Sequence, residues 1–71
     1  MAHPFSKLFD AALRHSTPED NRVLAEAEQL KAKGYGVEEI YAVLIRMQKE
    51  VVRDEDQEVV KEAAEQMGRY L

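Results

Sequence analysis

The sequence predicts an all-α fold, a small bundle of four helices with short connections. Apolar residues recur three and four positions apart in four segments, and no stretch alternates apolar and polar residues long enough to indicate a strand. The two prolines and three glycines fall at the ends of these segments, where helices start and stop. We expect helices at about residues 4–15, 18–33, 37–52 and 55–70, within one small helical domain over residues 1–71.

The first helix, at about 4–15, is expected to dock on the others. Pro4 suits a first helical position, where the missing N–H would have no partner anyway. The charged residues Lys7 and Arg14 lie on the face opposite the apolar one. The apolar face holds Phe5, Leu8, Phe9, Ala12 and Leu13. Two phenylalanines on this face predict that it packs into the core.

The second helix, at about 18–33, has a start signal and a stop signal. Thr17 can accept a hydrogen bond from the backbone N–H of Asp20, and Pro18 would take the first helical position. Gly34 is placed to end the helix in the left-handed conformation. The apolar stripe holds Val23, Leu24, Ala27 and Leu30.

The third helix, at about 37–52, is unusually apolar. Its apolar residues cover roughly 200° of the helical circumference, against about 100° for an ordinary surface helix. One flank holds Ile40, Val43, Leu44, Met47 and Val51, and the other holds Tyr41, Ile45 and Val52. Such a helix must contact two partners, either helices of its own chain or one of these and another subunit. Gln48 lies inside the apolar arc, and its amide needs a hydrogen-bond partner if it is buried.

The fourth helix, at about 55–70, follows the third after a short link, which favours an antiparallel hairpin. Asp54 as N-cap and Gln57 three positions later resemble a capping box. The core of the bundle is predicted to centre on Ala27, Leu30, Leu44, Met47, Val59, Ala63 and Met67.

The residues that catalysis needs are scarce. Cysteine is absent, which excludes disulfides, thiolate metal ligands and a cysteine nucleophile. The two histidines, His3 and His15, have no second ligand at metal-binding spacing, and Ser16 beside Thr17 is typical of a cap. No glycine-rich phosphate loop is present. The prediction is therefore no enzyme, no metal and no cofactor.

The charge distribution argues against nucleic acid as a partner. The formal net charge is −4, and residues 37–71 hold nine acids and five bases. Leu30, Gly34 and Ile40 have the spacing of a helix-turn-helix, so a small DNA-binding regulator is the alternative function. Its recognition helix would begin with Glu38 and Glu39, which repel phosphates. No apolar run is long enough for a signal sequence or a membrane span, so a cytoplasmic location is expected.

These observations predict a non-catalytic protein that acts by protein–protein interaction, either self-associating as a homodimer or docking on a larger partner. A chain this short without disulfides has a small core, which favours self-association. The predicted interaction surface consists of Tyr41, Ile45, Gln48 and Val52. The alternative is a closed bundle in which the other three helices cover the whole apolar arc.

Overall fold

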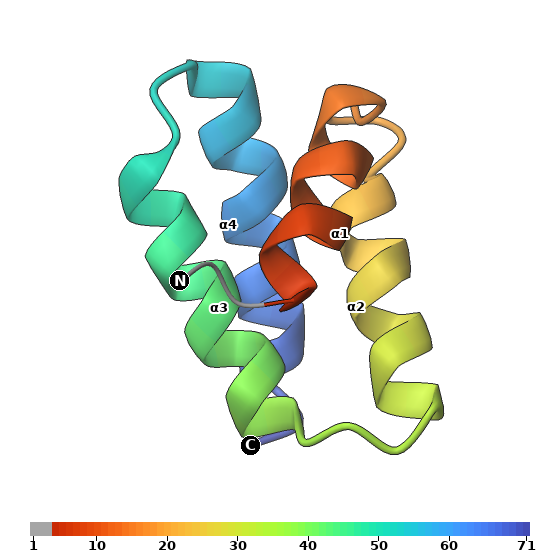
Figure 1. The fold of residues 1–71 in the computed structure, drawn as a ribbon. Coiled ribbons are helices and arrows are strands. Elements are labelled where there is room, and N and C mark those ends of the chain that lie inside the picture. Colours follow the sequence, from red (N-terminus) through yellow and green to blue (C-terminus); the bar gives the residue numbers. More distant parts are fainter. Residues whose placement is uncertain (1–3) are drawn as a thin grey trace.

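The computed structural model describes residues 4–71, and it is an all-α four-helix bundle, as predicted (Figure 1). Each helix runs opposite to the one before it (Figure 1). His3 lies outside the described residues. The helices are α1 (Pro4–Arg14), α2 (Arg22–Ala32), α3 (Val37–Glu50) and α4 (Asp54–Gly68).

The last helix forms the middle of the bundle. α2 and α3 both pack on α4, while α1 contacts all three other helices and closes the opening between α2 and α3 (Figure 1). The short link between α3 and α4 makes them the antiparallel hairpin that the sequence predicts. The core therefore lies on the side of this hairpin that faces α1 and α2.

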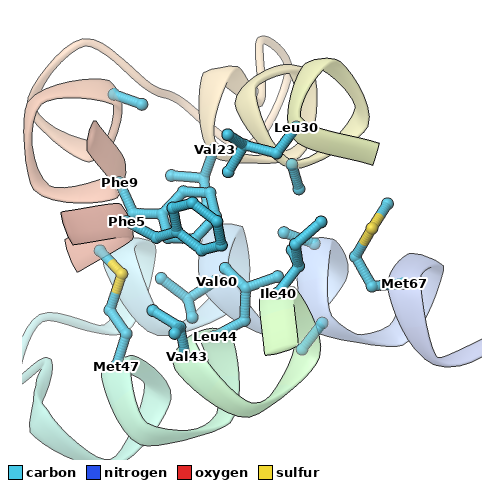
Figure 2. Close-up of a cluster of buried hydrophobic side chains, with 14 of the residues drawn as sticks. Phe5, Phe9, Val23, Leu30, Ile40, Val43, Leu44, Met47, Val60 and Met67 are labelled. Atoms are coloured by element: carbon cyan, nitrogen blue, oxygen red, sulfur yellow. The ribbon is translucent and has the colours of Figure 1, made fainter. Parts of the chain in front are cut away.

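The predicted core is confirmed. The seven residues expected at its centre are all buried, and so are Phe5 and Phe9. The two rings point from α1 into the space between α2 and α3, 6.4 Å apart and edge to face (Figure 2). Burial of a phenylalanine side chain contributes roughly 1.5–3 kcal/mol. α1 is thus an integral part of the core, as its sequence predicts.

The predicted start of α2 is wrong by four residues. Thr17 does accept from the N–H of Asp20, at 3.0 Å, but this bond closes a turn over Thr17–Asp20 and not a helical turn. The helix begins at Arg22, and Asn21 is its N-cap. The Asn21 Oδ1 accepts from the N–H of Leu24 at 2.9 Å, and its Nδ2 donates to the carbonyl of Val59 in α4 at 2.8 Å. The second bond fixes the start of α2 because it ties the cap to another helix.

The end of α2 matches the prediction. Gly34 has φ of 100°, in the left-handed region. Its N–H donates to the carbonyl of Lys31, and that of Tyr35 donates to the carbonyl of Leu30, which together form a Schellman motif. Two carbonyls of the last turn are satisfied in this way.

The predicted capping box of α4 does not form. Asp54 is the first helical residue, and Arg53 occupies the N-cap position without a side-chain hydrogen bond to the helix. Gln57 instead donates from its Nε2 to the carbonyl of Val51, at 3.2 Å, and so ties α4 back to the end of α3. Three acidic residues in the first turn complement the positive end of the helix dipole.

Candidate interaction surface

The predicted surface lies on the flank of α3 that borders α4. Tyr41, Ile45 and Gln48 are half-buried, while Val52 follows the end of the helix and is 87% exposed. We call these four residues together the outer seam. Tyr41, Ile45 and Gln48 are four and three residues apart in α3, so they stay on one side of the helix, while Val52 lies in the link to α4.

α4 covers part of the outer seam. The ring of Tyr41 lies against Gly68, where an added Cβ would come within 3.2 Å of the tyrosine Cε1. Tyr41 and Ile45 both pack against the core cluster. The lack of a side chain at Gly68 therefore leaves room for the tyrosine ring against α4.

The wide apolar arc of α3 is covered mainly by its own chain. Its first flank, with Ile40, Val43, Leu44 and Met47, is buried in the core (Figure 2). Val51 is half-buried and packs against the same core. What remains accessible is the outward part of Tyr41 and Ile45, together with Val52. The two partners that this helix requires are therefore found within the chain.

Gln48 lies at the polar end of the outer seam. It lines a shallow depression of about 460 Å³ between α3 and the first two turns of α4, together with Asp54, Gln57, Glu58 and Lys61. Gln48 is only half-buried, and no buried side-chain nitrogen or oxygen of the described residues lacks a hydrogen-bond partner. Its amide consequently does not need a partner from another chain.

A second row of residues borders the outer seam and was not predicted as part of the surface. It consists of Glu38, Ala42, Ile45 and Lys49, spaced four, three and four residues apart along α3, and we call it the outer row. Glu38, Ala42 and Lys49 are exposed, and Ile45 belongs to both rows. The helical spacing was visible in the sequence, but only the structure shows that three residues of this row are exposed and that Ile45 is half-buried.

Another accessible apolar site lies between α1 and α2. A depression of about 340 Å³ is lined by Leu8, three alanines and the polar residues of its rim, including His15 and Arg22. Leu8 is 44% exposed. Arg22 forms an ion pair with Asp20 at 3.4 Å. This site therefore combines one large exposed apolar side chain with a charged rim.

The exposed tyrosines at the other end of the bundle are held by their own chain. The ring of Tyr35 packs edge to face on Phe5, with the ring centres 5.0 Å apart. The Lys31 Nζ lies 4.3 Å from the centre of the Tyr70 ring, a cation–π contact that joins α2 to the end of α4. Both rings therefore contribute to the packing of this end.

The described residues contain no candidate metal site. No three or more His, Cys, Asp or Glu side chains of residues 4–71 could hold a metal ion jointly. Ser16 donates to the carbonyl of Ala12 at 2.8 Å and accepts from the N–H of Arg22 at 2.9 Å, so it links the end of α1 to the start of α2. Within the same range, no helix is both long and apolar enough to cross a membrane.

The first turn of α3, which would read DNA in a helix-turn-helix, is acidic. Glu38 and Glu39 are both exposed there, while Arg46 and Lys49 follow two and three turns later. A recognition helix meets bases and phosphates with its first residues. Carboxylates in these positions would be repelled by the phosphate backbone.

Comparison with protein-family models, with curated proteins and with solved structures finds no match to this chain.

Proposed function

We propose that this protein is a non-catalytic helical protein that binds a protein partner, a second copy or a larger protein, through the outer face of α3. The observation that carries the proposal is an apolar strip that consists of the half-buried Tyr41 and Ile45 on one side of this helix and the exposed Val52 in the link that follows it. A cytoplasmic location is part of the same proposal.

The chemistry of the strip suits a helical partner. The ring of Tyr41 lies against Gly68 of α4 and is half-buried, so part of it remains accessible to a side chain of a second helix. Tyrosine contributes strongly to interfaces because its ring offers a large, rigid contact area and its hydroxyl can remain hydrated. Charged side chains, including Glu38, Lys49 and Lys61, border the strip and would form a polar rim.

Site-specific photocrosslinking in cells tests the proposal. A photoreactive phenylalanine analogue is placed at Ile45 or Val52, and a matched control carries it at Glu28, which is exposed on α2. We expect adducts from positions 45 and 52. An adduct with a second copy would have twice the mass of this chain, and an adduct with a larger partner would have the summed mass of the two proteins. Adduct yields at both positions no higher than at position 28 would overturn the proposal.

A further inference from the structure

The outer row of α3 carries opposite charges at its two ends. Glu38 lies in the first turn and Lys49 in the last, with Ala42 and Ile45 between them. Neither Glu38 nor Lys49 forms an ion pair within the described part of the chain. Along one face of a 14-residue helix, the row therefore consists of an acidic, a small apolar, a large apolar and a basic side chain, in that order.

This order makes the row complementary to itself when it is reversed. In an antiparallel pairing about a two-fold axis between Ala42 and Ile45, Glu38 lies opposite the partner's Lys49. Ile45 then lies opposite the partner's Ala42, so that a large side chain meets a small one. The two-fold axis repeats each of these contacts.

We infer that the outer row of α3 binds a second copy of this chain in an antiparallel, two-fold arrangement, held by two Glu38–Lys49 pairs around two Ile45–Ala42 contacts. This inference rests on the proposed function and names its partner. A parallel arrangement is disfavoured, because it would set Glu38 against the partner's Glu38 and Lys49 against the partner's Lys49. A partner without this pattern of charges would leave one or both ends of the row unpaired.

The dimer is small and transient. Stable complexes bury about 800 Å² on each partner, which would be about a sixth of the 4937 Å² surface of this chain. One exposed row of a single helix, even with Tyr41 and Val52 beside it, covers less than that. Association is therefore expected only at high protein concentration, in the range from micromolar to about millimolar, and it should weaken as salt screens the end pairs.

Charge reversal tests the pairing by sedimentation equilibrium at low salt. Glu38→Lys sets two lysines opposite each other at both ends of the interface, and Lys49→Glu does the same with two glutamates. Each single variant should weaken dimerisation by about tenfold. The double variant Glu38→Lys/Lys49→Glu restores opposite charges across both ends and should recover the affinity to within about threefold.

The design separates association from folding. The double variant puts a base at the start of α3 and an acid at its end, so its helix dipole is the least well complemented. Recovered dimerisation in this variant therefore cannot result from a more stable monomer. Glu28→Lys on α2 makes the same change in net charge as Glu38→Lys, but away from the row, and should leave the dissociation constant unchanged.

The outcomes distinguish this inference from the proposed function. Dimerisation that the double variant fails to recover overturns the antiparallel pairing and leaves the proposed function in place. A wild-type chain that is monomeric up to about millimolar concentration overturns the second copy as partner. In that case a heavier adduct from position 45 would still support the proposed function. The absence of both dimer and adduct would contradict both.

Discussion

Replacing Asn21 by alanine removes two hydrogen bonds that fix the start of α2. Its Oδ1 caps the N–H of Leu24 at 2.9 Å, and its Nδ2 donates to the Val59 carbonyl of α4 at 2.8 Å. Loss of an N-cap costs about 1 kcal/mol, and loss of the side-chain hydrogen bond to the carbonyl of the other helix costs a similar amount. Asn21→Ala should therefore lower the free energy of unfolding by about 2 kcal/mol, and the Tm by roughly 8–16 °C.

Two further variants separate the bonds. Asn21→Ser keeps an oxygen that can cap Leu24 but cannot reach Val59 as the amide does, so it should cost about 1 kcal/mol. Asn21→Asp keeps the cap and sets a carboxylate oxygen against the Val59 carbonyl, so it should cost more than the serine variant. Urea unfolding followed by circular dichroism measures all three. A serine variant as stable as the wild type would refute the bond between the helices, and an alanine variant no less stable than the serine variant would refute the cap.

Three further predictions follow from the packing and the charges. Leu44→Asp should abolish the cooperative thermal unfolding transition because it buries a carboxylate in the core. Arg46→Asp, on the exposed side of α3, should keep this transition. A cooperative transition in Leu44→Asp would contradict the assignment of Leu44 to the core. Gly34→Ala should lower the free energy of unfolding by about 1 kcal/mol because of its φ of 100°. Gly36→Ala, with φ of −67° and open space around it, should cost less, because the restricted unfolded chain offsets the poorer N-cap of α3. Equal costs in urea unfolding would argue against the left-handed requirement at Gly34. Fluorescence anisotropy should detect no salt-dependent binding to duplex DNA, because Glu38 and Glu39 occupy the start of α3. Binding that weakens steeply as the salt concentration rises would favour the helix-turn-helix alternative.

The fold could be predicted largely from local patterns. The periodicity of apolar residues locates all four helices, the end of α2 follows from Gly34, and the start of α3 follows from the Gly36–Val37 boundary. The start of α2 could not be predicted in the same way, because Thr17 and Asn21 are both acceptable caps. The choice between them depends on Val59, 38 residues away, which no local pattern reveals.

The candidate surface was predictable only in part. The wide apolar arc of α3 follows from the sequence, but what covers it depends on tertiary packing. The close contact between Tyr41 and Gly68 joins residues from two helices, and it turns an apparently exposed tyrosine into a half-buried one. The structure also shows that Glu38, Ala42 and Lys49 are exposed and that Ile45, between them in the row, is half-buried.

Backbone amide chemical shifts, followed by NMR as the protein is diluted, test most directly whether the outer face of α3 binds a second copy. We expect concentration-dependent shifts in residues 38–49, centred on Ala42 and Ile45, and constant shifts around Glu28 on α2. At the same protein concentrations, the shifts should be smaller in Glu38→Lys and return in Glu38→Lys/Lys49→Glu. Shifts that stay constant throughout α3 at every concentration, or that move only around Leu8 between α1 and α2, would contradict this account of the surface.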